Sequence, residues 1–333
     1  MADMDDSAAH PYDKLEPGVI LDAVDAAGFA CDGTMLALNS YENRVYQVGQ
    51  DTGEPLVVKF YRPQRWSDEA ILEEHRFSKE LADQEIPVVA PLEDASGTSL
   101  FRYHDFRLAV FPRRGGRGPN LEDPDTRLWI GRFIGRIHAW GSTGPFEHRV
   151  SLTPQRLGHD SLRWLADNNF IPAELEIAWT TLVADVMQQV DTIWNGLPQI
   201  HTIRTHGDCH PGNILWTDEG PHFVDFDDTV MAPAVQDLWM LLSGERDEMQ
   251  LQLADYMEGY QQFHDFDPLE LNLIEALRTI RMINYSAWLA RRWQDPAFPM
   301  NFPWFNTTRY WEDQILALRE QLAAMQEAPL RLY

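Results

Sequence analysis

The chain is poor in cysteine and in basic residues, and each shortage excludes a class of protein. Its 333 residues include only two cysteines, Cys31 and Cys209, too few for a disulfide framework or a zinc cluster. The 27 lysines and arginines stand against 52 aspartates and glutamates, which gives a formal net charge of −25. Because so acidic a surface repels nucleic acid and anionic lipid, we expect neither as a partner.

Long apolar runs are also missing. No stretch approaches the roughly 20 apolar residues of a membrane span. The opening residues, MADMDDSAAHPYD, lack the basic and apolar regions of a secretory signal, so we expect a cytoplasmic protein. The composition, 44% hydrophobic and 11% aromatic, is typical of a globular chain with a substantial core.

The first part of the chain alternates short apolar runs with turn-forming residues. Residues 17–29 predict a short helix that follows a proline and ends at a glycine. Five strands are expected, at TMLALNS, RVYQVG, PLVVKFY, near VVAPLEDA and at FRLAVFP. Between the third and fourth, a long helix is predicted to begin at Ser67 and to stop before Pro87. The pattern indicates a mostly antiparallel sheet that carries one long helix.

The segment PRRGGRGPN interrupts this pattern with glycine and proline, and helical periodicity dominates after it. The predicted helices cover residues 126–140, 172–194, 234–242, 246–263, 269–293 and 310–326, around an island of short strands and loop at residues 202–228. We therefore predict an α+β, bilobal, protein-kinase-like fold. Its parts are an N-terminal nucleotide-binding lobe (1–112), a hinge (113–124) and a C-terminal catalytic and substrate lobe (125–333).

The non-helical island holds the residues that indicate chemistry. It contains the pattern H-G-D-x-x-x-x-N, with Asp208 and Asn213, followed by D-F-D, which begins at Asp225 after the strand HFV. Phosphoryl transfer needs a carboxylate that orients and deprotonates the acceptor hydroxyl, and a few oxygen ligands for magnesium. We predict Asp208 as the base and Asn213 and Asp225 as Mg²⁺ ligands, with Asp225 also catalytic. One such aspartate alone would indicate an exposed loop or a helix cap, but the joint pattern favours chemistry.

Lys59 lies inside the apolar strand VVKFY, where a lysine needs a partner for its charge. Glu73 and Glu74 on the following helix are spaced like the glutamate of the lysine–glutamate pair that holds ATP phosphates in kinases. Spacing does not separate the two glutamates, and we prefer Glu74. The alternative for Lys59 is an edge-strand lysine whose head reaches solvent.

Two further segments are candidates for ATP contacts. The loop at residues 39–44 lacks G-x-G-x-x-G, so Ser40 and nearby backbone amides would have to cover the phosphates; an ordinary hairpin turn is the alternative. The strand that ends LAVFP offers backbone groups to adenine around Phe111. The predicted ATP-contacting residues are therefore Ser40, Lys59, Glu74 and Phe111.

Several other residues have a structural and a functional interpretation. We interpret His206 and Asp237 as supports of the catalytic loop, and Cys209 as a buried, inert thiol rather than a redox switch. Four tryptophans could either pack in the core, which we prefer, or bind a quaternary ammonium group by cation–π attraction. They are Trp288, Trp293, Trp304 and Trp311. Four arginines either pair with local carboxylates or receive an acidic or phosphorylated substrate: Arg278, Arg281, Arg291 and Arg292.

Several blocks of the sequence resemble a known family. The blocks include L-N-S-Y-E-N-R-V-Y-Q-V, V-V-K-F-Y-R-P, H-G-D-C-H-x-G-N-I-L-W and F-V-D-F-D-D. They resemble the bacterial stress response kinases, serine/threonine protein kinases with the fold of aminoglycoside phosphotransferases and choline kinases, from about residue 15 to residue 325. The resemblance implies that Asp208 accepts the proton, that Asn213 and Asp225 bind Mg²⁺, and that Ser40 touches ATP. It also implies a monomeric cytoplasmic enzyme linked to survival under envelope or oxidative stress.

The chain departs from eukaryotic-type protein kinases at Gly207, where arginine is usual, and at Asp227, in place of the D-F-G glycine. It also lacks the glycine-rich loop and the A-P-E segment, which fits the aminoglycoside phosphotransferase branch. We predict an ATP- and Mg²⁺-dependent serine/threonine protein kinase that also phosphorylates itself. The alternatives are a small-molecule kinase of the aminoglycoside, choline or homoserine kinase type, and a nucleotide-binding pseudokinase scaffold. The scaffold is disfavoured because every expected catalytic side chain is present.

Overall fold

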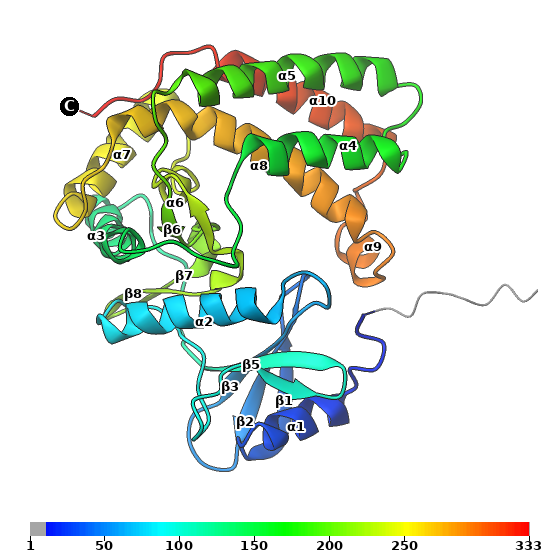
Figure 1. Ribbon diagram of the computed structural model, residues 1–333, viewed down its shortest axis with the longest axis vertical. Coiled ribbons are helices and arrows are strands. Elements are labelled where there is room, and N and C mark those ends of the chain that lie inside the picture. The colour runs from blue at the N-terminus through cyan, green and yellow to red at the C-terminus, as the bar shows by residue number, and fades with distance from the viewer. Residues whose placement is uncertain (1–10, 333) are drawn as a thin grey trace, which may run out of the picture. The chain divides into compact units, whose positions relative to one another are not determined.

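The computed structural model describes residues 11–332, so predictions about residues 1–10 and 333 lie outside the described part. The chain divides into two compact units (Figure 1). The first runs to Gly116 and also contains His222–Asp227, and the second comprises Arg117–Pro221 and Asp228–Tyr333. The boundary after Gly116 falls within the predicted hinge. Residues 222–227, which the sequence analysis placed in the C-terminal lobe, belong to the first unit.

The first unit contains a five-stranded antiparallel sheet in the order β1-β2-β3-β5-β4. A mostly antiparallel sheet was predicted, and four of the five expected strands are present. Its strands are β1 (Cys31–Leu38), β2 (Arg44–Gln50), β3 (Leu56–Phe60), β4 (Phe101–Tyr103) and β5 (Phe106–Pro112). The strand expected at VVAPLEDA is wrong, since this segment makes a single isolated bridge, from Val88 to Phe223. Pro87 and Pro91 lack the N–H groups that a ladder requires, and the unpredicted β4 takes the edge instead.

One face of this sheet packs on helix α1 (Pro17–Ala26). Alternate residues of β3, including Val58 and Phe60, share a buried apolar cluster with Ile20 and Val24 of α1. The period of two along a strand therefore directs the intervening residue, Lys59, to the opposite face.

Helix α2 (Asp68–Asp83) lies on that opposite face, where its Ile71 packs against Ala109 of β5 (Figure 1). The helix begins as predicted, because the Oγ of Ser67 accepts a hydrogen bond from the N–H of Ala70 at 3.2 Å. Lys59 and the buried side of α2 thus lie on the same face of the sheet.

The second unit consists mainly of helices. They are α3 (Pro124–Gly141), α4 (Asp160–Asp167), α5 (Glu176–Gly196), α6 (Gln236–Trp239), α7 (Arg246–Tyr260), α8 (Ile274–Arg291), α9 (Ala297–Asn301) and α10 (Thr308–Ala324). Short turns of other helix types add η1 (Gln155–His159), η2 (Pro211–Asn213) and η4 (Pro268–Leu273), while η3 (Phe226–Asp228) begins in the first unit. The short strands are β6 (Ile203–Thr205), β7 (Ile214–Thr217), β9 (Val230–Ala232) and β8 (Gly220–Phe223), the last of which ends in residues of the first unit. Strand β6 pairs with β9, and β7 pairs with β8. The sequence analysis missed α4 and α9.

Helices α3 and α7 approach so closely that glycines are needed at their contact. A Cβ atom at Gly131 of α3 would lie 2.1 Å from the carbonyl oxygen of Tyr256, and one at Gly135 would lie 2.5 Å from that of Tyr260. This contact positions α7. The hydroxyl group of Tyr260 then lies 2.9 Å from Nδ1 of His138, whose Nε2 lies 3.0 Å from Asp237. Among residues 11–332, no helix combines the length and the apolar character that crossing a membrane would require.

Candidate active site

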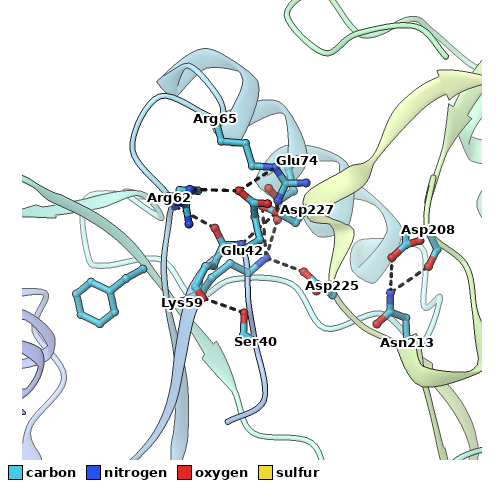
Figure 2. A network of polar contacts seen from close by, with 12 residues as sticks. Ser40, Glu42, Lys59, Arg62, Arg65, Glu74, Asp208, Asn213, Asp225 and Asp227 are labelled. Carbon is cyan, nitrogen blue, oxygen red and sulfur yellow. Dashed lines mark hydrogen bonds and ion pairs between the residues drawn. The ribbon is translucent and has the colours of Figure 1, made fainter. Parts of the chain in front are cut away.

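Lys59 is the centre of an ion-pair network in the first unit. Its Nζ lies 3.0 Å from Oδ1 of Asp225, 3.4 Å from Oε1 of Glu74 and 3.9 Å from Oδ1 of Asp227 (Figure 2). The lysine is therefore not an edge-strand lysine that extends to solvent. Of the two glutamates that spacing left open, Glu74 is the one in this ion pair with Lys59.

The surrounding carboxylates keep Lys59 charged. Burial alone would favour the neutral amine, but the charges of Asp225, Glu74 and Asp227 outweigh it and hold the pKa of Lys59 well above its ordinary value. The ring of Phe111 also lies beneath this ammonium, with its centroid 5.5 Å from Nζ. A fixed positive charge at this place can bind phosphate oxygens.

Asp227 joins the same network from the D-F-D segment. It forms an ion pair with Arg65, and its Oδ2 accepts a hydrogen bond from Nδ2 of Asn43 at 3.1 Å. Arg62 adds a pair with Glu42, at 3.7 Å between Nε and Oε1. The sequence analysis missed these residues, although Lys59, Arg62 and Arg65 bring three cations into seven residues of an acidic chain.

Asp225 differs from the other carboxylates of this network in its exposure. Its side chain is 54% exposed, whereas those of Glu74, Asp227 and Glu42 are 3%, 4% and 11% exposed. Its backbone has φ +61°, in the left-handed region that aspartate tolerates better than most residues. Asp225 is thus the member of the set whose oxygens can reach a ligand in solvent.

Ser40 lies in the turn between β1 and β2, where its Oγ donates to the carbonyl oxygen of Asn43 at 3.1 Å. Asn43 also accepts, through Oδ1, a hydrogen bond from the N–H of Arg62 at 3.0 Å. These bonds connect the loop at residues 39–44 to the end of β3. The contact of Ser40 with ATP and the contact of Phe111 with adenine stay predictions.

The loop that carries Asp208 belongs to the second unit, and Asp237 holds its backbone. The Oδ2 of Asp237 accepts from the N–H of His206 at 2.7 Å, and its Oδ1 accepts from the N–H of Gly207 at 2.8 Å. His138 lies 3.0 Å from the same Oδ2. The interpretation of Asp237 as a support of this loop is confirmed.

Gly207 is required by the path of the same loop. Its φ of +84° is unfavourable for any residue with a side chain, and a Cβ there would lie 2.1 Å from the carbonyl oxygen of Asp228. The buried His206 accepts, through Nδ1, a hydrogen bond from the N–H of Asp208 at 3.3 Å. His206 therefore stabilises the loop, as interpreted.

Asp208 is surrounded by cationic and hydrogen-bonding side chains, of which Arg281 forms an ion pair. Nη1 of Arg281 on α8 lies 2.7 Å from its Oδ1, and Nε2 of His210 lies 3.5 Å from its Oδ2. Nδ2 of Asn213 donates to the carbonyl oxygen of Asp208 at 3.0 Å and to its Oδ2 at 3.4 Å (Figure 2). Because Asn213 uses its amide nitrogen for both contacts, its amide oxygen is the atom that can bind a cation.

These donors keep Asp208 ionised. Burial alone would raise its pKa, but the hydrogen bond from His210 and the charges of Arg281, His210 and His206 lower the pKa below its ordinary value. The ionised carboxylate can accept a hydrogen bond from a hydroxyl group.

Cys209, next to Asp208, is a buried thiol. Burial, together with the negative charges of Asp237 and Asp208, raises its pKa well above the ordinary value. Because the thiolate is the reactive form, this environment supports the inert thiol and not the redox switch.

The four indoles considered for a quaternary-ammonium site pack into an aromatic cluster. Trp311 is fully buried and meets Trp179 edge-on, with ring centroids 5.1 Å apart. Trp288 packs against Phe298, and Trp293 packs against Phe305. The described structure thus favours packing as the main role of these indoles.

A surface cavity of about 620 Å³ lies elsewhere in the second unit, along α5. Its lining residues include His159, Val183, Met187 and Asp191. None of the predicted site residues lines it, so it does not bear on the phosphotransfer chemistry.

The two clusters together contain the groups that phosphoryl transfer requires. Lys59 supplies a buried positive charge, Asp208 an ionised carboxylate, and Asp225 and Asn213 the hard oxygen atoms that Mg²⁺ prefers. Residues 11–332 contain no group of three or more histidines, cysteines, aspartates or glutamates suited to a metal ion. The exposed carboxylate of Asp225 and the amide oxygen of Asn213 are each suited to a cation that takes its other ligands from phosphate and water.

Comparison with known proteins places the chain in a family. A model described as the phosphotransferase enzyme family matches residues 34–274, and the chain belongs to this family. Stress response kinase A of Escherichia coli (strain K12) is 42% identical, over 98% of both chains. Serine/threonine protein kinase RdoA of Salmonella typhimurium (strain LT2) is 41% identical, over 97% of this chain and 98% of that one.

Solved structures show the same fold at low identity. An amicoumacin kinase, hAmiN, in complex with AMP-PNP, Ca²⁺ and Ami, covers 95% of both chains with a TM-score of 0.71 and 18% identity. A microcompartment-associated aminopropanol kinase covers 96% of this chain and 100% of its own, with a TM-score of 0.69 and 17% identity. The predicted α+β, kinase-like fold class is confirmed. The family and the named relatives support the coarser functional prediction, a kinase.

Proposed function

We propose that this kinase is an ATP- and Mg²⁺-dependent serine/threonine protein kinase, which transfers the γ-phosphoryl group of ATP to protein hydroxyls and also phosphorylates itself. The observation that carries the proposal is the ionised Asp208, held in a loop whose backbone Asp237 fixes. The 42% identity to a stress response kinase over nearly the whole chain supports a protein acceptor and a role in stress survival.

In this proposal Asp208 orients the acceptor hydroxyl and takes its proton. The new bond joins the acceptor oxygen to the γ-phosphorus, and the bond from that phosphorus to the bridging oxygen of ADP breaks. Lys59, kept in place by Glu74, binds phosphate oxygens, while Ser40 and Phe111 contact the nucleotide. The transition state concentrates negative charge, so fixed positive charge is the main catalytic contribution.

Magnesium is the proposed cofactor, with Asn213 and Asp225 as its protein ligands. It neutralises charge on the ATP phosphates when bound. The exposed carboxylate of Asp225 and the available amide oxygen of Asn213 support this assignment. Asp225 is catalytic in this sense, through the metal it holds.

The functional organisation proposed from the sequence also stays a proposal. We propose a nucleotide-binding lobe (1–112), a hinge (113–124) and a catalytic and substrate lobe (125–333). Residues 222–227 are added to the nucleotide-binding lobe. We further propose a cytoplasmic monomer with ATP and protein substrates as its partners.

The acceptor class is tested by incubating the protein with γ-labelled ATP, Mg²⁺ and a bacterial cell extract, then separating protein-bound from soluble label. We expect label on serine or threonine of proteins, including this protein itself. If label appears only on small polar alcohols, the chain is a small-molecule kinase of the aminoglycoside, choline or homoserine type.

Asp208→Ala tests the base. Because a positioned base contributes about 10²- to 10⁴-fold, we expect a loss of phosphotransfer in that range while MgATP still binds. Undiminished turnover of the variant would contradict the role of Asp208.

Asp225→Ala tests the metal assignment. We expect the affinity for MgATP, measured by calorimetry, to fall at least about tenfold, the factor for ~1.4 kcal/mol. The difference from the unchanged protein should shrink when a chelator removes Mg²⁺. Asp218→Ala, which removes an exposed carboxylate from the turn after β7, is the matched control. Equal affinities of the Asp225 and Asp218 variants would count against the assignment.

A further inference from the structure

Helix α8 carries a concentration of positive charge that the composition of the chain makes unusual. The helix holds three arginines and one acidic residue, Glu275, and Arg292 follows its last residue, in a protein with a formal net charge of −25. Arg278 is paired with Glu275, at 3.6 Å between Nε and Oε2, and lies over Trp239. Arg281 instead extends to the catalytic loop, where its charge meets Asp208.

The contact of Arg281 with Asp208 is short, and the arginine side chain itself is accessible. Nη1 lies 2.7 Å from Oδ1 of Asp208, yet the arginine side chain is 44% exposed and that of Asp208 is 20% exposed. A guanidinium has five N–H donors in a planar fork, and one short contact leaves others available. A positive charge that can bind a second anion therefore lies beside the carboxylate that receives the acceptor hydroxyl.

A flat aromatic surface continues from Arg281 along the same side of α8. Tyr285 and Trp288 follow at i+4 and i+7, and their rings stack with centroids 5.6 Å apart and an interplanar angle of 20°. Arg292, at i+11, lies over Trp288 at 5.5 Å. Tyr285 is 40% exposed, so part of this stack faces solvent. We call Arg281, Tyr285, Trp288 and Arg292 the α8 face.

We propose that Arg281 is the specificity-determining residue of the acceptor site, and that it selects serine or threonine residues flanked by an acidic side chain. This inference rests on the proposed protein kinase function and names the acceptor class for it. The α8 face is the surface along which the flanking segment of the acceptor lies.

Charge complementarity is the reason for assigning an acidic acceptor segment. The negative field of the whole molecule disfavours such a segment everywhere except at a local excess of arginine. A bidentate bond between a guanidinium and a carboxylate is directional, so it can place the neighbouring hydroxyl beside Asp208. A basic segment would meet the arginines of α8 with like charge, which adds repulsion to the lost attraction.

Matched peptides test the proposal. Each holds one serine, with glutamate, glutamine or lysine at one nearby position, and kcat/KM is measured for each with the full chain, ATP and Mg²⁺. For the unchanged protein we expect glutamate to exceed glutamine by about tenfold at the preferred position, which corresponds to ~1.4 kcal/mol. The preference should fall as salt rises, because the arginine is partly exposed.

Variants that change the charge at position 281 distinguish two roles of Arg281: selecting an acidic acceptor segment, and only positioning Asp208. We expect Arg281→Gln to abolish the preference, so that the glutamate and glutamine peptides give about equal kcat/KM. Arg281→Lys should retain part of the preference, and Arg281→Glu should favour the lysine peptide. Arg309→Gln is the control, since it removes an exposed arginine paired with Asp313 on α10, and it should leave the preference unchanged. Unchanged MgATP affinity and circular dichroism would show that each variant folds.

Two results would overturn the inference while leaving the kinase function intact. One is an unchanged preference in Arg281→Gln, and the other is a fall in kcat that is equal for all peptides, as a purely positioning role predicts. Transfer to small alcohols alone, with no peptide or protein labelled, would overturn the proposed function and this inference with it.

Discussion

The clusters around Lys59 and Asp208 hold their functional groups by different physical means. In the first unit, Lys59 is held by three carboxylates whose charges exceed the cost of its burial. In the second unit, Asp208 is held by the backbone of its loop, whose N–H groups bond to Asp237. Its own partners, Arg281 and His210, are partly exposed.

This difference has consequences for what each cluster tolerates. A buried set of charges is stable only as a set, because the loss of one member leaves the others uncompensated in a medium of low polarity. A loop fixed through backbone hydrogen bonds keeps its shape when a side chain at its tip changes. We therefore expect substitutions in the first cluster to affect folding, and substitutions at the tip of the second to affect activity alone.

Lys59→Met should give the largest effect on stability. It leaves Glu74 and Asp227, with side chains 3% and 4% exposed, without the lysine charge. Removing one partner of such a buried set typically costs about 3–5 kcal/mol, which chemical denaturation would measure. Phosphotransfer should also be lost.

Two controls accompany this measurement. Lys59→Arg keeps the charge and should cost less, while Arg281→Gln, at an exposed position, should change the unfolding free energy by at most about 1 kcal/mol. Equal costs for Lys59→Met and Arg281→Gln would show that the two clusters do not differ in this way.

The sequence predicted much of the first cluster, because its chemistry is visible in local patterns. A lysine in an apolar strand needs a counter-charge, and a glutamate on the next helix can supply it, so Lys59 and Glu74 were found together. Arg65 and Asn43 were missed as partners of Asp227, since no spacing rule connects residues more than 160 positions apart. The strand expected near Val88 failed because apolar character was weighed above the missing N–H groups of two prolines.

For the second cluster, the sequence predicted the loop residues but not the side chains from other elements that surround Asp208. The pattern around Asp208 and Asn213 is compact in sequence, so the loop could be recognised from it. Arg281 lies on α8, 73 positions beyond Asp208, and it appeared only as one of four equivalent arginines. Which of the four meets the carboxylate depends on how α8 packs, and periodicity does not determine that.

Asp237→Ala tests the backbone support of the second cluster. It removes the acceptor of two buried N–H groups, those of His206 and Gly207, and it removes the partner of His138. Each unsatisfied buried donor costs about 1–3 kcal/mol, so we expect the two together to lower the unfolding free energy by at least about 2 kcal/mol.

Activity should fall in the same variant, although Asp237 is not proposed to touch a substrate. Displacement of Asp208 by the relaxed loop would lower kcat, while KM for ATP should change little. Asp237→Asn, which keeps one acceptor oxygen, should lie between the alanine variant and the unchanged protein. Full activity of Asp237→Ala would show that the loop keeps its shape without this support.

Glu270→Gln should change stability only as pH changes, and it tests whether a titrating group lies behind the second cluster. Glu270, in η4, is buried, and its Oε2 accepts a hydrogen bond from the N–H of Val235 at 2.9 Å, two residues before Asp237. Burial is the main cause that raises its pKa from the ordinary 4.5 to about 7. Between these values the folded chain keeps a proton that the unfolded chain has released.

The sign of the pH dependence follows from that proton. Because the folded state binds more protons than the unfolded state between about pH 4.5 and pH 7, this group makes stability fall as pH rises through that range. The loss amounts to at most about 3 kcal/mol. Glutamine keeps an acceptor for Val235 but does not titrate, so Glu270→Gln should gain stability relative to the unchanged protein as pH rises, and the gain should level off above about pH 7. A constant stability difference between the two proteins across this pH range would show that folding does not raise the pKa of Glu270.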